Sequence, residues 1–139
     1  MKSFLSPLLR NDSTPHVLEN ARSGAIVADN LLTAFDSASR RQGLLGRDSL
    51  PEGNALIIAP SNAVHTFFMR FPIDIAFVRR DGRVIKVRSA VGPRRLAAAI
   101  RGFAVVELPA GALARSRTEP GDMLICRPVN PPLDPSIGS

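Results

Sequence analysis

The sequence has one cysteine, Cys126, no tryptophan or tyrosine, and only two histidines, His16 and His65. A single cysteine excludes an internal disulfide and an all-cysteine zinc site. Without tyrosine the chain has no phenol for proton transfer, and its seven phenylalanines are the only aromatic platforms for stacking bases. There is also no G-x-S-x-G elbow, HExxH, CxxC or glycine-rich phosphate loop. These absences exclude the commonest hydrolases, zinc proteases and nucleotide-binding enzymes.

Long hydrophobic runs are missing as well. No apolar stretch approaches the length needed to cross a membrane. The first ten residues, MKSFLSPLLR, contain a short apolar run that is interrupted by Pro7 and closed by Arg10, which is not typical of a signal peptide. We therefore predict a cytoplasmic protein with no membrane span.

The charge of the chain is basic, at +6 over 139 residues, and sixteen of the eighteen basic residues are arginine. Arginine pairs well with phosphate, but these arginines are scattered and no nucleic-acid recognition motif accompanies them. Nucleic acid is therefore not the expected partner. The alternative is a polyanion-binding surface formed by Arg79, Arg80 and Arg83 at a hairpin tip, together with Arg94 and Arg95.

Proline and polar residues mark both ends of the chain. Residues 1–15 are broken by Pro7 and Pro15, and residues 129–139 are rich in proline, so both segments are predicted to be disordered. Between them, residues 16–128 are predicted to form a single compact domain. Its 45% hydrophobic and 22% charged residues are ordinary for a globular protein.

Short apolar runs separated by turn residues predict an α+β domain that is mainly antiparallel β, barrel-like or sandwich-like. We expect one main short helix over residues 33–45, capped by Thr33 or Asp36 and ended by Gly43 or Gly46. The segments RRLAAAI and AGALARSR are each expected to form a turn or two of helix. Strands are expected around residues 16–20, 24–29, 55–59, 64–69, 73–79, 83–91, 103–108 and 122–127.

The turn at residues 80–82 allows two hairpin registers. A two-residue loop pairs apolar residues with basic ones, whereas a three-residue loop with its glycine left-handed pairs Phe77 with Ile85. Because a slip of one residue turns apolar side chains to the wrong face, we expect the three-residue register throughout. That register also places Asp74 opposite Arg88.

The candidate site lies around His65, Met69 and Glu107. Glu107 falls in a strand expected to be mostly buried, where a carboxylate must pair with an arginine or face a cavity. An ion pair with Arg40 or Arg47 is the preferred interpretation, and a pocket where Glu107, His65 and an arginine meet a small ligand is the alternative. Packing in the core is likewise preferred for His65, and copper binding by His65 and Met69 is disfavoured because no further ligand can be named.

Four motifs, RRQGLLGRDSLP, FFMRFPIDIAFVRRDGRVI, VVELPAG and EPGD, occur in this order along the chain. In their order and spacing the chain resembles the bacterial and archaeal domain-of-unknown-function 192 family, from about residue 25 to residue 126. The resemblance implies a compact β-rich domain with little helix, and it implies no activity. The family pattern falls on Arg40, Gly43, Leu44, Arg47, Phe67, Met69, Pro72, Asp74, Asp81, Gly82, Glu107, Leu108, Gly111, Gly121 and Asp122.

Together these features predict a non-enzymatic module that binds a small ligand or a partner protein. The candidate ligand-binding residues are Arg40, Arg47, His65, Met69, Asp74 and Glu107. We expect a monomer with no cofactor and no metal. One alternative is an enzyme of an unrecognised class, with His65 as general acid or base and Glu107 or Asp74 setting its pKa. The other is the polyanion-binding surface at the hairpin tip.

Overall fold

The computed structural model describes residues 2–10, 13–67 and 69–129 of the chain. Its elements in chain order are the 3-10 helix η1 (Ser6–Leu9), β1 (His16–Asn20), β2 (Ile26–Ala28), β3 (Asn30–Ala34), α1 (Ser37–Gln42), β4 (Asn54–Ile58), β5 (Ala63–His65), β6 (Ile73–Val78), β7 (Val84–Val91), β8 (Leu96–Ala98), β9 (Ala104–Pro109), α2 (Ala112–Ser116) and β10 (Leu124–Pro128). The α+β fold predicted from the sequence is confirmed.

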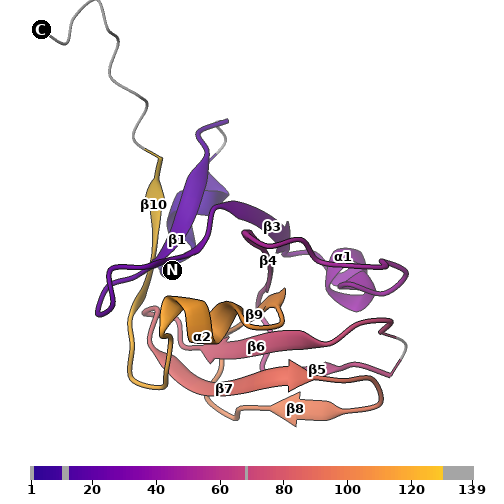
Figure 1. Ribbon diagram of the computed structural model, residues 1–139. Coiled ribbons are helices and arrows are strands. Elements are labelled where there is room, and N and C mark those ends of the chain that lie inside the picture. Colours follow the sequence, from indigo (N-terminus) through magenta and orange to yellow (C-terminus); the bar gives the residue numbers. More distant parts are fainter. Residues whose placement is uncertain (1, 11–12, 68, 130–139) are drawn as a thin grey trace, which may run out of the picture.

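Three sheets organise these elements (Figure 1). The central sheet has the strand order β3-β4-β9-β6-β7, in which only the β3–β4 pair is parallel. A three-stranded sheet, β10-β1-β2, brings the last strand against the first, and β5 and β8 pair as a separate two-stranded sheet. The sheets of the described residues are open and do not close into a barrel.

The core lies on both faces of the central sheet. All six residues of β6 and all six of β9 are buried, as expected for strands covered on both sides. Because side chains alternate along a strand, Val106 belongs to one core cluster and Val105 to the other. Glu107 therefore shares the face of Val105, where Leu44 and Met69 also pack.

The turn between β6 and β7 is the three-residue loop that was expected. The Arg79 amide donates to the Arg83 carbonyl, Val78 pairs with Val84, and Gly82 has a φ of +100°. Only glycine adopts this backbone conformation without strain. The prediction for the turn is confirmed.

Beyond the turn, the expected register is wrong. A bulge between Phe77 and Val78 shifts the pairing by one residue, so Phe77 lies opposite Lys86 and Ile75 lies opposite Arg88. The prediction assumed that one face of β6 is buried. Because both faces are buried, a slip exposes no apolar side chain, and the hydrophobic pattern does not determine the register.

The main helix is shorter than expected. Thr33 and Ala34, which were expected to start the helix, belong instead to β3, which pairs in parallel with β4 along its whole length. The helix α1 begins after Asp36, which forms a capping box with Ser39, and ends at Gly43. AGALARSR contains α2 as predicted, but the prediction of helix for RRLAAAI is wrong, because Leu96–Ala98 pairs with β5.

The N-terminal segment also departs from expectation. Residues 6–9 form η1, Leu5 is only 2% exposed, and the Phe4 amide donates to the Arg80 carbonyl. Its apolar side chains pack against the core, so the prediction of disorder is wrong for residues 2–10. Of the predicted disordered tail, residues 129–139, all but residue 129 fall outside the described residues.

Candidate functional site

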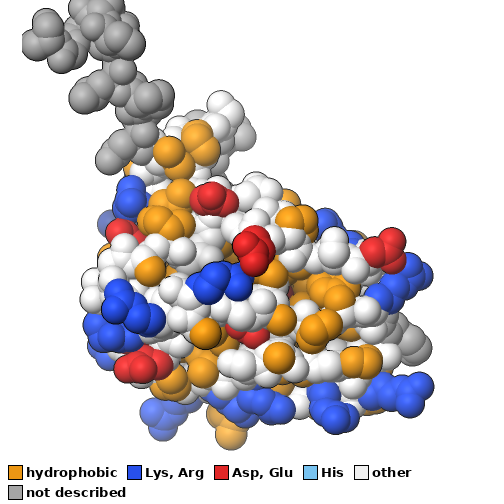
Figure 2. All heavy atoms as spheres, in the orientation of Figure 1, with side chains coloured by type: hydrophobic (Ala, Val, Ile, Leu, Met, Phe, Trp, Pro, Cys, Tyr) orange, Lys and Arg blue, Asp and Glu red, His pale blue; other side chains and the backbone are white. Residues whose placement is uncertain are grey.

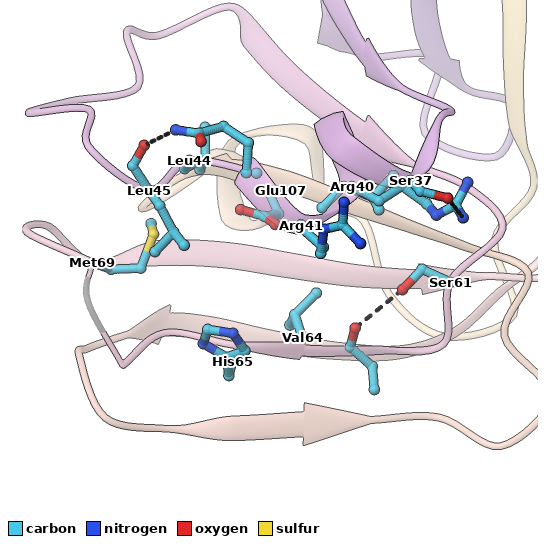
Figure 3. Close-up of a pocket in the computed structure, with 14 residues that line it drawn as sticks. Ser37, Arg40, Arg41, Leu44, Leu45, Ser61, Val64, His65, Met69 and Glu107 are labelled. Atoms are coloured by element: carbon cyan, nitrogen blue, oxygen red, sulfur yellow. Dashed lines mark hydrogen bonds between the residues drawn. The ribbon is translucent and has the colours of Figure 1, made fainter.

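A pocket of about 560 Å³ opens beside α1 (Figure 3). Its walls come from Ser37 and residues 40–45, in α1 and the turn after it, and from Ile58, Ser61, residues 63–65 and Met69. Glu107 lines it from β9, the strand next to β4 in the central sheet. The pocket therefore lies where the helix, the central sheet and the β5–β8 sheet meet.

The helix α1, which is capped at both ends, forms one wall of this pocket. The Ser39 amide donates to the Asp36 carboxylate at 2.8 Å, and this bond holds the pKa of Asp36 below its usual value. At the other end the Gly43 amide donates to the Ser39 carbonyl, and Gly43 has a φ of +48°. A Cβ at Gly43 would lie 3.9 Å from Oε1 of Glu107, so the helix end sits directly against the carboxylate.

Glu107 has no protein partner among the described residues. Its residue surface is only 5% exposed, yet no hydrogen bond or ion pair joins its carboxylate to another described group. Among the described residues, every side-chain nitrogen or oxygen that is fully shielded from solvent has a hydrogen-bond partner. The Glu107 oxygens are therefore open to the pocket, and burial raises the pKa of Glu107 to about 7.

The preferred interpretation of Glu107, an ion pair with an arginine, is wrong. Arg40 lines the pocket, but its guanidinium donates to the Phe35 carbonyl at 2.7 Å and to the Ser37 hydroxyl at 3.4 Å. Arg47 is exposed and does not line the pocket. A carboxylate in this position is left without compensation from the described residues.

His65 and Met69 lie in the opposite wall. His65 is the last residue of β5, and its exposed ring contacts Phe67 at a centroid distance of 5.7 Å. The expectation that His65 packs in the core is therefore wrong. Met69 is 8% exposed, and its amide donates to the carbonyl of Thr66. The Thr66 hydroxyl donates to the Gly92 carbonyl at 2.6 Å, which ties this turn to the end of β7.

Asp74 does not line the pocket and has a structural role. Its carboxylate accepts hydrogen bonds from the amides of Ala90 at 2.8 Å, Gly111 at 3.1 Å and Leu113 at 3.0 Å. Two of these donors belong to the start of α2, so Asp74 caps that helix from a neighbouring strand. The predicted partner, Arg88, lies opposite Ile75 instead.

The structure thus brings together four of the six candidates, Arg40, His65, Met69 and Glu107. Arg41, which was not among the candidates, lines the pocket beside Arg40 and forms no hydrogen bond or ion pair with another described residue. The signal for it was the Arg40-Arg41 pair in the last turn of the helix. The pocket accordingly holds one buried acid and two arginines, and its walls include apolar side chains such as Leu44.

The arginines proposed for polyanion binding fall into two separate groups. Arg79 lies 4.0 Å from Asp81, Arg80 lies 4.1 Å from the centre of the Phe103 ring, and Arg83 donates to the Gly121 carbonyl. Arg94 and Arg95 follow the other end of β7, an eight-residue strand that spans roughly 25 Å. The two groups do not form one surface.

Three further features bear on the class of site. Within residues 2–10, 13–67 and 69–129, no three His, Cys, Asp or Glu side chains gather as they would around a metal ion. In the same residues we find no helix with the length and apolar character needed to cross a membrane. Cys126 is buried, and burial raises the pKa of its thiol to about 12.

Comparison with protein families decides the identity of the domain. The model of the domain-of-unknown-function 192 (DUF192) family, described as Uncharacterized ACR, matches residues 18–126. The chain belongs to the DUF192 family. The resemblance that the sequence motifs carried is confirmed, and the match includes every pocket residue from Ser37 to Glu107.

Two solved structures share the fold. One is a protein of unknown function from Novosphingobium aromaticivorans DSM 12444, with a TM-score of 0.68, 26% identity, and coverage of 79% of this chain and 82% of that one. The other, from Sinorhizobium meliloti 1021, is described as a proposed transcription regulator. It has a TM-score of 0.70 and 23% identity, and covers 81% of this chain and 92% of that one, a likeness of fold alone. No curated protein matches this chain.

Proposed function

We propose that this DUF192 domain is a non-enzymatic binding module for a small zwitterion, with an amine facing Glu107 and an acidic group facing Arg40 and Arg41. The observation that carries the proposal is the Glu107 carboxylate, which is buried, unpartnered within the described chain and open to the pocket. A volume of about 560 Å³ is in the range of small-molecule sites.

The amine follows from the energetics of a buried carboxylate. Burying an ionised carboxylate without a partner is costly, and the free protein reduces that cost by raising the pKa of Glu107 to about 7. An ammonium group at this position would stabilise the ionised form. It would supply the charge and the N–H donors that the surrounding residues do not provide.

The acidic group follows from the two arginines. Arg40 uses two of its guanidinium nitrogens on Phe35 and Ser37, which fixes its position. Arg41 makes no such bonds within the described chain and is exposed in the wall of the pocket, so it is free to pair with a carboxylate or phosphate. Figure 3 shows both arginines and Glu107 around the same space, with Val64 and His65 across from them.

Binding is favoured over catalysis by the state of the nucleophiles in the pocket. Ser61 donates its hydroxyl proton to the Ala63 carbonyl, and the Ser37 hydroxyl accepts from Arg40. Neither hydroxyl is bonded to His65, so no base activates a nucleophile there. Asp74, the second acid considered for an enzyme, is occupied by three backbone amides away from this space.

The proposal is tested by titrating the isotope-labelled protein with the zwitterions phosphoethanolamine, glycine and β-alanine. Methylamine, acetate and phosphate serve as controls that carry only an amine or only an acidic group. Amide shifts are read by NMR for the wild type, Glu107→Gln and Arg41→Gln. The matched control is Glu52→Gln, whose carboxylate is exposed and lies 3.5 Å from Arg115.

We expect one or more zwitterions to shift the amides of residues 40–45, 63–65 and 107 and to bind more tightly than any single-function compound. Glu107→Gln and Arg41→Gln should each weaken binding about tenfold or more, the size of a charge-assisted hydrogen bond, and Glu52→Gln should leave it unchanged. Binding that is indifferent to Glu107→Gln, or shifts away from these residues, would contradict the proposal.

A further inference from the structure

The positive charge of the protein is concentrated in one segment. Residues 82–106, between Asp81 and Glu107, contain six basic residues and no acidic one, and the rest of the chain contains twelve basic and twelve acidic residues. The whole net charge of +6 therefore comes from this segment. Its sequence covers β7, β8 and the loops that flank β8.

Three arginines of this segment, Arg94, Arg95 and Arg101, flank β8 and are exposed. None of the three forms an ion pair with a carboxylate of the described chain. Arg94 and Arg95 immediately precede the strand, and Arg101 follows it by three residues. Both ends of β8 thus carry unneutralised positive charge.

Large aliphatic side chains are exposed between these arginines. Leu96 is 69% exposed and Ile100 is 94% exposed. Leu96 pairs with His65 across the sheet, and directly paired residues point to the same face, so Leu96 belongs to the outer face of the β5–β8 sheet. Ala97, between two exposed neighbours, is buried and holds the strand against the core.

The exposure of Ile100 is built into the backbone. It lies in a turn closed by a bond from the Gly102 amide to the Ala99 carbonyl, and the Ala99 amide is itself bonded to the Asn62 carbonyl. Ile100 is therefore presented to solvent by a hydrogen-bonded turn. Figure 2 shows Lys and Arg side chains interspersed with hydrophobic ones along the lower edge of the molecule, where Figure 1 places β8.

We propose that this surface, Arg94, Arg95, Leu96, Ile100 and Arg101, docks the domain on an anionic membrane. The arginines pair with acidic headgroups, and the two aliphatic side chains enter the boundary between headgroups and acyl chains. A nucleic acid would use the positive charge and the exposed rings of His65 and Phe67, but it would leave the aliphatic side chains of Leu96 and Ile100 without an apolar partner. The surface adjoins the pocket through the His65–Leu96 pair, but this proposal does not depend on the ligand of the pocket.

The test is sedimentation of the whole chain with vesicles of phosphatidylcholine alone or of equal parts phosphatidylcholine and phosphatidylglycerol. The variants are Leu96→Ser with Ile100→Ser, and Arg94→Gln with Arg95→Gln and Arg101→Gln. Matched controls are Leu9→Ser, at an exposed leucine elsewhere on the surface, and Arg47→Gln, at an exposed arginine elsewhere. Circular dichroism confirms that each variant is folded, and a single-stranded RNA is titrated in parallel.

We expect binding to the phosphatidylglycerol vesicles only, weakened by salt, with each lost arginine reducing the partition coefficient about fivefold. The aliphatic double variant should reduce it by at least about tenfold, and the two controls should bind as the wild type does. Equal binding to both kinds of vesicle, no binding, or aliphatic variants that bind normally would overturn the proposal. RNA binding lost only in the arginine variant would assign the surface to nucleic acid instead.

Discussion

Replacement of Glu107 by glutamine should change how stability depends on pH. Glu107 is 5% exposed, and burial raises its pKa from 4.5 to about 7. Between these two values the folded protein holds the carboxyl proton and the unfolded chain does not, so the free energy of unfolding falls as pH rises. The contribution of this proton is complete below pH 4.5 and is lost above about pH 7.

The size of the effect follows from the same two values. A pKa raised from 4.5 to about 7 corresponds to about 3 kcal/mol of stability lost across that interval. Glutamine has nearly the same shape and does not ionise, so the variant should lack this loss. Relative to the wild type, it should gain about 3 kcal/mol between pH 4.5 and pH 8.

The assay is urea denaturation at several pH values between 4.5 and 8, followed by circular dichroism because the chain has no tryptophan or tyrosine. Glu52→Gln serves as the control, since that carboxylate is exposed. If wild type and Glu107→Gln lose stability in parallel over this range, the carboxylate is not buried without a partner, and the reasoning fails.

Three other substitutions or reagents test the structure, each by a simple measurement. Asp74→Ala should lower the free energy of unfolding by about 3–5 kcal/mol, because three backbone amides lose a charged acceptor; a loss below about 1 kcal/mol would refute the capping role. Gly82→Ala should lower the melting temperature, since its Cβ would lie 2.5 Å from the Leu124 carbonyl oxygen at a φ of +100°, and an unchanged melting temperature would contradict that geometry. Cys126, buried and with a pKa of about 12, should resist iodoacetamide until the protein is denatured; rapid alkylation of the native protein would show that the thiol is accessible.

Most of the fold could be predicted from the sequence because its strands are short apolar runs bounded by turn residues. The turn at Gly82 and the cap at Asp36 were predictable for the same reason, since each depends on a local conformational preference. The bulge near Phe77 and the strand at Leu96 depend instead on partners distant in the sequence. Local propensity carries no information about those partners.

The sequence indicated which residues form most of the candidate site, but not how their side chains are arranged. The burial of Glu107 follows from its apolar neighbours in β9, but whether an arginine reaches it depends on where α1 ends. In the structure Arg40 turns to the Phe35 carbonyl, and Asp74 finds backbone donors at α2. Both outcomes depend on tertiary contacts that the sequence pattern does not specify.

The zwitterion proposal depends on Glu107 being a buried acid that binds an amine. Its most direct test is a titration of the Glu107 side-chain carboxyl by carbon-13 NMR, without and with phosphoethanolamine, glycine or β-alanine. We expect a pKa of about 7 in the free protein and a lower pKa when a bound amine stabilises the ionised form. An ordinary pKa near 4.5 in the free protein, or a raised pKa that none of these compounds lowers, would contradict it.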